Sequence, residues 1–356
     1  MRKINQLSFE EETIFCGIDV HKKNWSVSIR DSRWELENYS QNPDSDALAA
    51  HLKSRYPEAN YKAVYEAGFC GFSIQRRLTE LGIECIVVNA ADVPSSDKDN
   101  KRKKDKRDAR KLSRELSKGE LKAIYVPEPF MEHARSLVRQ RTRFVWDQTR
   151  CKNRIWHLMM FSGIEMEAEK AKRYWSKAFI KKMKHLPFGD DNLKDTFDLA
   201  LEEFMEIRKL VLNATRKIRA LSQSDCFELI QKLLQSIPGI GLINAMIIHT
   251  EVMDIKRFKT LDSFCDYVGI VPDTHSTGER DKSRGITHRS NGYLRPAIVE
   301  SSWVITRKDP AMLMRYNKAC KTKEPNQAII VVAKHLLSKI RYVWTNQQAY
   351  ITDKIS

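Results

Sequence analysis

The chain has 356 residues, more than a typical single domain, so two or three hydrophobic cores are expected. Lys and Arg number 62 against 46 Asp and Glu, and the formal net charge of +16 favours a polyanionic partner, with nucleic acid the first candidate. No apolar run is long enough to cross a bilayer and the first residues lack the apolar region of a signal peptide, so we expect a cytoplasmic protein without a membrane partner.

The first third of the chain predicts alternating strands and helices, with period-two runs rich in β-branched and aromatic residues. The expected elements are strands at 13–20, 25–29 and 34–39, a helix at 46–55 capped by Ser45, a strand at 61–65, a helix at about 71–81 and a strand at 83–88. The first three strands indicate an antiparallel meander. Three strands, helix, strand, helix, strand is the order of an α/β ribonuclease-H-like fold.

The middle of the chain changes in composition. Residues 92–104 are polar and basic, which indicates a loop that becomes ordered on nucleic acid. Residues 132–222 have little glycine apart from a break at 186–190, and they predict long helices in a coiled-coil-like hairpin or an intramolecular bundle. The hairpin would allow dimerisation, so a homodimer and a homotetramer both stay open. We predict three domains, at residues 1–125, 126–225 (the helical connector) and 226–356.

The last third opens with a glycine-containing turn between two helices. Residues 237–241 (IPGIG) separate an apolar stretch at 227–234 from a helix expected at 242–248, and they resemble a helix-hairpin-helix turn. Gly239 and Gly241 would allow the backbone to approach a phosphate, which the amides at the next helix N-terminus would bind. A tight structural turn is the alternative, and the positive net charge favours phosphate binding.

Four carboxylates have positions from which they could converge. Asp19 ends the first strand, Glu66 follows the fourth, and these strands are neighbours in a ribonuclease-H-like sheet. Asp105 and Asp108 are three residues apart and therefore share one face of the helix after the basic loop. Such oxygen ligands suit Mg²⁺ or Mn²⁺, and two ions can stabilise the entering and leaving oxygens of a phosphoryl displacement.

Each acid alone could equally be a solvated surface residue. The cations around Asp105 and Asp108 favour the metal interpretation, because they would hold a phosphate backbone beside the carboxylates. We assign six of them to nucleic-acid binding: Lys101, Arg102, Lys103, Lys104, Arg107 and Arg110.

Five segments carry a family resemblance when they are taken in order. They are residues 18–25 (IDVHKKNW), 65–68 (YEAG), 105–110 (DKRDAR), 237–241 (IPGIG) and 268–295. Over nearly the whole chain they resemble the insertion sequence 110 family of transposases, relatives of the Piv DNA invertase. The resemblance implies a RuvC-like N-terminal domain with an Asp-Glu-Asp-Asp (DEDD) metal site at Asp19, Glu66, Asp105 and Asp108. It also implies a helical connector and a C-terminal transposase domain with a catalytic serine.

The expected serine position differs in this sequence. The family usually has Ser directly before Gly, whereas Thr277 precedes Gly278 here and Ser276 lies one place earlier. Either hydroxyl could form a covalent phosphoester that preserves bond energy for rejoining. The less hindered primary hydroxyl favours Ser276, and position favours Thr277. Without the resemblance, this stretch would be interpreted as a polar turn.

Cations follow the candidate nucleophiles. They surround Gly285 and Asn291-Gly292, which we expect in turns, and we assign three to DNA or RNA contact: Arg284, Arg289 and Arg295.

The sequence thus predicts a recombinase that cuts and rejoins double-stranded donor and target DNA, with metal-bound carboxylates of one domain beside a hydroxyl of another. The resemblance implies that a noncoding bridge RNA selects both DNAs. One alternative is a RuvC-like structure-selective nuclease that hydrolyses DNA with the four carboxylates and water. The other is a non-catalytic basic RNA-binding protein that retains the fold.

Overall fold

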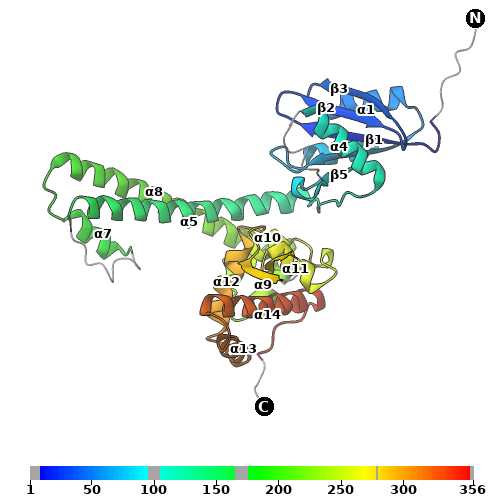
Figure 1. Ribbon diagram of the computed structural model, residues 1–356. Helices are drawn as coiled ribbons and strands as arrows, with labels where there is room; N and C mark the ends of the chain where they lie inside the picture. Colours follow the sequence, from blue (N-terminus) through cyan, green and yellow to red (C-terminus); the bar gives the residue numbers. More distant parts are fainter. Residues whose placement is uncertain (1–8, 95–104, 165–174, 278–279, 353–356) are drawn as a thin grey trace, which may run out of the picture. The chain divides into compact units, whose positions relative to one another are not determined.

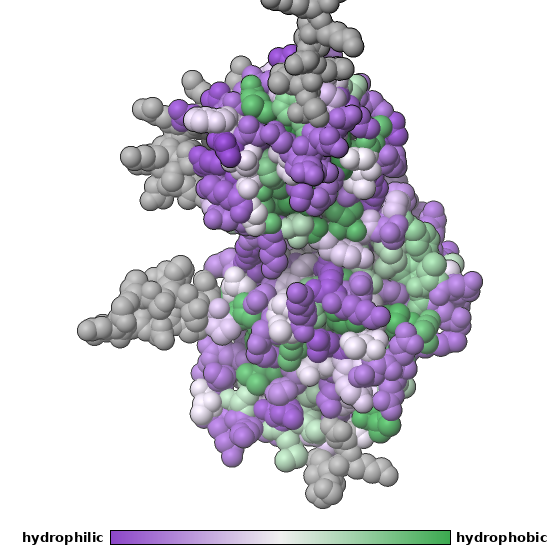
Figure 2. Space-filling model, turned by 90° about the vertical axis from the view of Figure 1, so that its right-hand side faces the viewer, coloured by the Kyte–Doolittle hydropathy of each residue, from purple (hydrophilic) through white to green (hydrophobic). Residues whose placement is uncertain are grey.

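The computed structural model describes residues 9–94, 105–164, 175–277 and 280–352, apart from the side chains of 105–106 and 273–284. The chain forms two compact units, Met1–Val126 and Pro127–Ser356 (Figure 1). No helix in the described ranges is long and apolar enough to cross a membrane. Hydrophilic residues cover most of the face in Figure 2, with hydrophobic residues interspersed among them.

The first unit contains a five-stranded mixed sheet in the order β3-β2-β1-β4-β5. The strands are β1 (Thr13–Val20), β2 (Trp25–Arg30), β3 (Glu35–Gln41), β4 (Asn60–Glu66) and β5 (Glu84–Val88). β1, β2 and β3 pair antiparallel, whereas β4 is parallel to both β1 and β5. The predicted meander and the ribonuclease-H-like topology are therefore confirmed.

Helices cover both faces of this sheet. Successive side chains of a strand point to opposite faces, and both sets of side chains are apolar here. Ala63 and Tyr65 belong to the core that α1 (Ser45–Arg55) and α2 (Ser73–Glu80) cover. Val64, between them in sequence, packs with Leu112 of α4 (Asp105–Lys118) on the other side. Because both faces are buried, the central strands are almost continuously apolar.

The cap of α1 corrects one prediction. Asp44, and not Ser45, is the N-cap residue, because its Oδ1 accepts hydrogen bonds from the amides of Asp46 and Ala47 at 2.8 and 3.0 Å. Asp and Ser are both favoured as N-cap residues. Because they are adjacent here, the sequence pattern could not fix the start of α1 to better than one residue.

The outer edge of β5 is paired by the chain that leaves the first unit. The amide of Ile124 donates to the carbonyl of Val87 at 2.8 Å, and Val88 forms an antiparallel bridge with Ala123. The last residues of the unit therefore add a short sixth segment to the sheet.

The second unit begins with two long helices that lie side by side, α5 (Pro129–Phe161) and α8 (Asp191–Leu221) (Figure 1). Ile155 and Met159 of α5 share a core with Phe197 and Phe204 of α8. The predicted break at 186–190 lies between α7 (Lys177–Lys184) and the start of α8. The structure therefore contains a helical hairpin whose inner face is filled within one chain.

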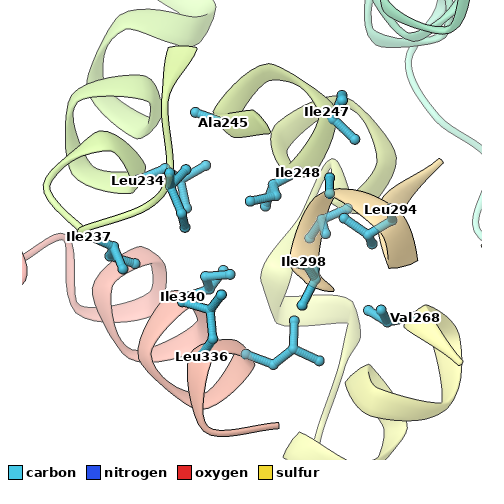
Figure 3. Packing of buried hydrophobic residues seen from close by; sticks show 14 of the residues in the cluster. Leu234, Ile237, Ala245, Ile247, Ile248, Val268, Leu294, Ile298, Leu336 and Ile340 are labelled. Atoms are coloured by element: carbon cyan, nitrogen blue, oxygen red, sulfur yellow. The ribbon is translucent and has the colours of Figure 1, made fainter. Parts of the chain in front are cut away.

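The rest of the second unit is a helical domain with one hairpin. Its elements are α9 (Asp225–Gln235), α10 (Leu242–Val252), η2 (Ile255–Arg257), α11 (Leu261–Val268), β6 (Pro272–Thr277), β7 (Arg280–Ile286), α12 (Leu294–Ile305), α13 (Pro310–Cys320) and α14 (Pro325–Asn346). Ile248 of α10 packs among Leu234, Ile298 and Leu336, which come from three other helices (Figure 3). Every residue of α10 from Ala245 onward is buried, so this helix forms the centre of the domain.

Candidate active site and nucleic-acid interface

Two of the predicted carboxylates lie at the same end of the sheet. In the parallel pair β1 and β4, Ile18 is in register with Tyr65, and the next residue on each strand is Asp19 and Glu66. Both acids are partly buried, and 20% of the Asp19 side chain is exposed. The prediction that these strands are neighbours is confirmed, and the acids are accessible without being freely solvated.

A histidine accompanies Asp19 that sequence reasoning did not single out. Nε2 of His21 lies 3.1 Å from Oδ2 of Asp19, within hydrogen-bonding distance. The two residues are two apart, just where β1 ends, and His21 stands inside the segment 18–25 that carried the family resemblance. A polar residue directly after the strand, two positions from its acid, was the signal available in the sequence.

The helix that carries the other two acids packs directly against β1 because Gly17 has no side chain. A Cβ atom on Gly17 would lie 2.2 Å from the carbonyl oxygen of Ala109 and 2.5 Å from the amide nitrogen of Ser113. Asp108 immediately precedes Ala109 and is partly buried, whereas the Asp105 side chain lies outside the described residues. The close approach at Gly17 therefore fixes the acidic helix against the strand that ends in Asp19.

The candidate nucleophiles lie in a β-hairpin. Ser276 and Thr277 are in β6 rather than in a polar turn, in register with Asp281 and Arg280 of β7. Their side chains lie outside the described residues. Gly285, predicted to form a turn, is instead in β7 with a φ of +99°, opposite an irregularity in the register of β6. Glycine tolerates this φ, which explains its presence inside a strand.

Tight packing holds the segment that follows the hairpin. Gly269 has a φ of +82°, and a Cβ atom there would lie 2.4 Å from Cβ of Ser290 and 2.8 Å from the carbonyl oxygen of Arg289. Nη2 of Arg295 donates to the carbonyl of Thr287 at 2.6 Å. Burial lowers the pKa of the Arg295 guanidinium. The Arg295 side chain thus binds the backbone of the preceding segment. Arg289 is exposed, and the Arg284 side chain lies outside the described residues.

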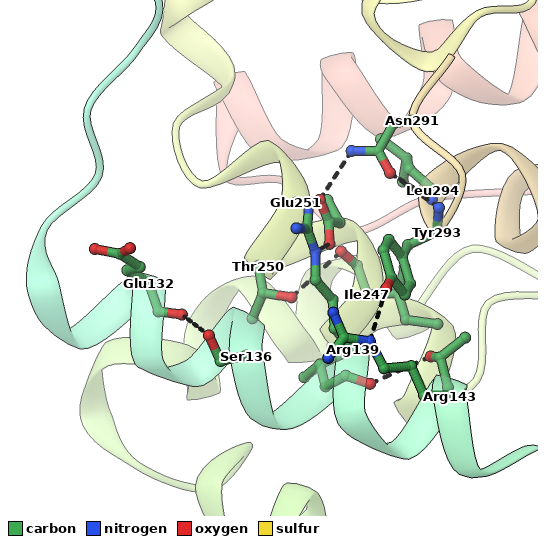
Figure 4. A network of polar contacts seen from close by, with 12 residues as sticks. Glu132, Ser136, Arg139, Arg143, Ile247, Thr250, Glu251, Asn291, Tyr293 and Leu294 are labelled. Atoms are coloured by element: carbon green, nitrogen blue, oxygen red, sulfur yellow. Dashed lines mark hydrogen bonds and ion pairs between the residues drawn. The ribbon is translucent and has the colours of Figure 1, made fainter. Parts of the chain in front are cut away.

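A buried carboxylate joins α5, α10 and the segment before α12 (Figure 4). Both oxygens of Glu251, which is completely buried, accept hydrogen bonds from Nε and Nη2 of Arg139 at 2.7 Å. Oε2 also accepts from Nδ2 of Asn291 at 2.8 Å, and the hydroxyl of Tyr267 donates to the Glu251 carbonyl at 2.8 Å. Burial acts to lower the pKa of the Arg139 guanidinium, but the hydrogen bonds and charge of Glu251 outweigh it and raise that pKa.

The two glycines of the turn between α9 and α10 have different surroundings. Gly239 has a φ of +95°, and a Cβ atom there would lie 2.7 Å from the carbonyl oxygen of Ser301 in α12. The space beside Gly239 is therefore filled by protein. Gly241 is the exposed N-cap of α10, and a Cβ atom there would meet nothing within 4 Å in the described structure. Of the two, Gly241 leaves its backbone open to a phosphate.

Comparisons with known proteins identify the family. Residues 231–317 match the family described as transposase IS116/IS110/IS902, and residues 16–161 match the DEDD transposase family of IS110 elements. The chain is 31% identical over 295 residues to y4qE of Sinorhizobium fredii, a protein named as a transposase, covering 81% of this chain and 71% of that one. The chain belongs to the IS110 family of transposases.

Other relatives of the transposase carry insertion-sequence names. It is 25% identical to the transposase for insertion sequence element IS1533 of Leptospira borgpetersenii, over 68% of this chain and 70% of that one. It is 22% identical to the transposase for insertion sequence element IS1111A of Coxiella burnetii, over 77% of this chain and 75% of that one. The family establishes DNA as the substrate of the transposase and a carboxylate domain that uses divalent metal.

The carboxylates of the transposase fit such a metal by their chemistry. Asp19, Glu66 and Asp108 offer hard oxygen donors on partly buried side chains, as Mg²⁺ and Mn²⁺ prefer. Among the side chains that the structure describes, no three acidic, His or Cys groups are close enough to hold an ion, and Asp105 is not among those side chains. The candidate metal site therefore rests on the positions of the two strand ends and on the packing of α4, and its ligands stay a prediction.

The predicted DNA-binding cations near α4 divide into two groups. Arg107 is exposed, and Arg110 is exposed but pairs through Nε with Oε1 of Glu35 on β3 at 2.8 Å. An exposed ion pair of this kind contributes little to stability and can exchange its partner for a phosphate. The four cations at 101–104 lie outside the described residues.

Proposed function

We propose that this transposase cuts and rejoins double-stranded donor and target DNA with Mg²⁺ (or Mn²⁺) held by Asp19, Glu66, Asp105 and Asp108. The observation that supports the proposal is that Asp19 and Glu66 end neighbouring parallel strands, while Gly17 brings the helix with the other two acids against the first of them. The bound ion would stabilise negative charge on the phosphate oxygens during displacement. The four carboxylates would hold and orient the scissile phosphate through that ion.

For the chemical step we propose a hydroxyl nucleophile, Ser276 or Thr277. The hydroxyl loses its proton to a base and its oxygen bonds to phosphorus, while the bond from phosphorus to the leaving deoxyribose oxygen breaks and that oxygen takes up a proton. A free hydroxyl of the other DNA then attacks the same phosphorus and releases the side chain. No bond energy is lost to water, so the strands can be rejoined without a cofactor that supplies energy.

We further propose that a noncoding bridge RNA selects the DNAs by base pairing, and that the assembly is a homodimer or homotetramer. The family resemblance and the net charge of +16, which suits a second nucleic acid, support the RNA. Because both DNAs must be held at once, more than one copy of the chain is expected.

The experiment is to incubate the purified transposase with Mg²⁺, its element's flanking noncoding RNA and labelled donor and target DNA, and to search for protein-linked DNA after denaturation. Peptide mapping of an adduct to Ser276 or Thr277 would name the nucleophile. Ser276→Ala and Thr277→Ala, singly and together, should identify the required hydroxyl. Ser290→Ala, which removes an exposed hydroxyl from the same domain, should leave the adduct intact.

Asp19→Ala should abolish cleavage altogether, because the adduct cannot form without the metal site. Cut DNA with no adduct at any time point, undiminished in the double hydroxyl variant, would mean hydrolysis by water and would overturn the proposed nucleophile. DNA exchange that is equally efficient without the RNA would overturn the proposed guide.

A further inference from the structure

An exposed aromatic stack lies on α5. Trp146 is 43% exposed, and its ring lies nearly parallel to that of Tyr293, with centroids 5.3 Å apart and planes inclined by 25°. Tyr293 immediately precedes α12, so the two rings come from segments far apart in the sequence. One side of the Trp146 ring therefore has an aromatic partner, and much of its surface faces solvent.

The inner ring of this stack is fixed from three directions. The Arg139 guanidinium lies 4.7 Å from the centre of the Tyr293 ring, and Nε of Arg143 donates to the Tyr293 hydroxyl at 3.2 Å. Oδ1 of Asn291 accepts from the Tyr293 amide at 3.0 Å, while its Nδ2 donates to the buried Glu251 (Figure 4). Because the Tyr293 ring is held in this way, it loses little further conformational entropy when a ligand stacks on the exposed Trp146 ring.

The surroundings of Trp146 indicate what the outer ring would bind. Its neighbours one turn away on α5 are polar or cationic, namely Thr142, Arg143, Thr149 and Arg150, and the adjacent Asp147 pairs with Arg150. A protein partner would need a wider apolar patch than a single ring. A flat, uncharged heterocycle attached to a phosphate matches one ring flanked by guanidinium groups.

We propose that Trp146 stacks on an unpaired nucleobase and that Arg143 and Arg150 bind the adjoining phosphates. Both arginines are exposed, and the contact of Arg143 with Tyr293 uses Nε. Arg150 forms an exposed ion pair with Asp147 through Nη2, so a phosphate would have to replace or share that carboxylate partner. The inference rests on the proposed function for the presence of nucleic acid, and it adds a specific site for a single-stranded nucleotide. Base-paired nucleic acid does not offer the face of a base, so the site would discriminate against continuous duplex.

The test uses single-stranded DNA and RNA oligonucleotides of one sequence containing 2-aminopurine, with the full-length protein and without divalent metal. Stacking on Trp146 should quench the probe, and Trp146→Ala should lose the quenching and bind about ten-fold more weakly. Trp146→Phe should retain most of the quenching and most of the binding affinity. The DNA and RNA arms show which strand the site prefers, and the matching duplex should give no quenching.

Trp34→Ala is the matched control, because Trp34 is 71% exposed in the first unit and should not affect the probe. Trp146→Leu retains apolar packing on Tyr293 and should also lose the quenching, so a folding defect in the alanine variant would not hide the result. Equal affinity and quenching in the wild type, the alanine and the leucine variants would overturn the inference. The Ser276→Ala, Thr277→Ala double variant should quench normally, so loss of recombination with normal quenching would separate the two proposals.

Discussion

Arg139 and Glu251 are 112 residues apart in the chain and form a two-pronged ion pair, with both nitrogen-to-oxygen distances at 2.7 Å. The carboxylate is completely buried and also accepts a hydrogen bond from Asn291. The pair therefore connects the long helix α5 to the centre of the C-terminal helices and to the segment that leads into α12.

Removing the arginine should destabilise the second unit strongly. Arg139→Ala leaves the Glu251 carboxylate buried without its main partner, so the free energy of unfolding should fall by about 3–5 kcal/mol. Arg154→Ala on the same helix breaks an exposed pair with Glu203 and should cost less than about 1 kcal/mol. Chemical denaturation monitored by circular dichroism measures both. Equal losses would show that burial of the Glu251 pair does not govern stability.

Acid should destabilise the same unit through His249. This ring is buried between Phe227 and Trp344, with centroids 4.9 and 5.0 Å away, and burial lowers its pKa from 6.5 to about 4. Between these values the unfolded chain binds a proton that the folded chain does not. Stability is therefore complete above pH 6.5 and is lost as the pH falls toward 4, by up to about 3 kcal/mol.

Thermal unfolding between about pH 7 and about pH 4.5 measures this loss. His249→Phe keeps an aromatic ring in the core and should flatten the pH dependence. His157→Gln, at an exposed position on α5, should leave it unchanged. A His249→Phe variant that loses as much stability in acid as the wild type would rule out His249 as the source.

A methyl group at position 17 should damage the carboxylate site. Gly17→Ala would place Cβ 2.2 Å from the Ala109 carbonyl oxygen, so α4 must move away from β1. We expect metal-dependent DNA cleavage to fall by at least about ten-fold, because catalytic groups tolerate only small displacements. Gly189→Ala meets nothing within 4 Å in the described structure and is the control. Normal cleavage by Gly17→Ala would mean that the position of α4 is unimportant for catalysis.

An exposed arginine and an arginine that is hydrogen-bonded to the protein backbone should respond differently to mutation. Arg107 is exposed on α4, so Arg107→Ala should weaken nucleic-acid binding and reduce the slope of log affinity against log salt by about one. Arg295→Ala instead removes the hydrogen bond to the Thr287 carbonyl and should mainly lower the melting temperature. Salt titrations of binding, with melting curves alongside, separate the effects. A reduced salt slope in Arg295→Ala would place that residue at the nucleic acid after all.

The sequence predicted the first unit better than the second, for a physical reason. The strands alternate with period two over short stretches, and their order with α1 and α2 allows few sheets, so the neighbourhood of Asp19 and Glu66 could be predicted. Glu251 could not be found in this way. It stands at the end of the apolar helix α10, and its partners come from α5 and the segment before α12, contacts that no local pattern records.

Conformation rather than residue type explains the remaining differences. Gly285 is a typical turn residue, yet its positive φ serves an irregular hairpin pairing, and Gly239 serves the approach of α12. Arg295 is predicted to contact nucleic acid because its charge is visible in the sequence, whereas the Thr287 carbonyl that it binds in the structure is not. The assignments of the metal ligands and of the nucleophile stay predictions.

The pairing of Ile124 with Val87 also affects how the protein behaves in solution. An open edge strand can recruit a strand from another molecule and start aggregation. The edge at β5 is occupied by the chain's own exit segment, and the other edge, β3, carries Glu35 and Glu37 and pairs irregularly with β2 near Arg30. Neither edge of the five-stranded sheet is a good template for intermolecular β-pairing, so the proposed oligomer is expected to form without using this sheet.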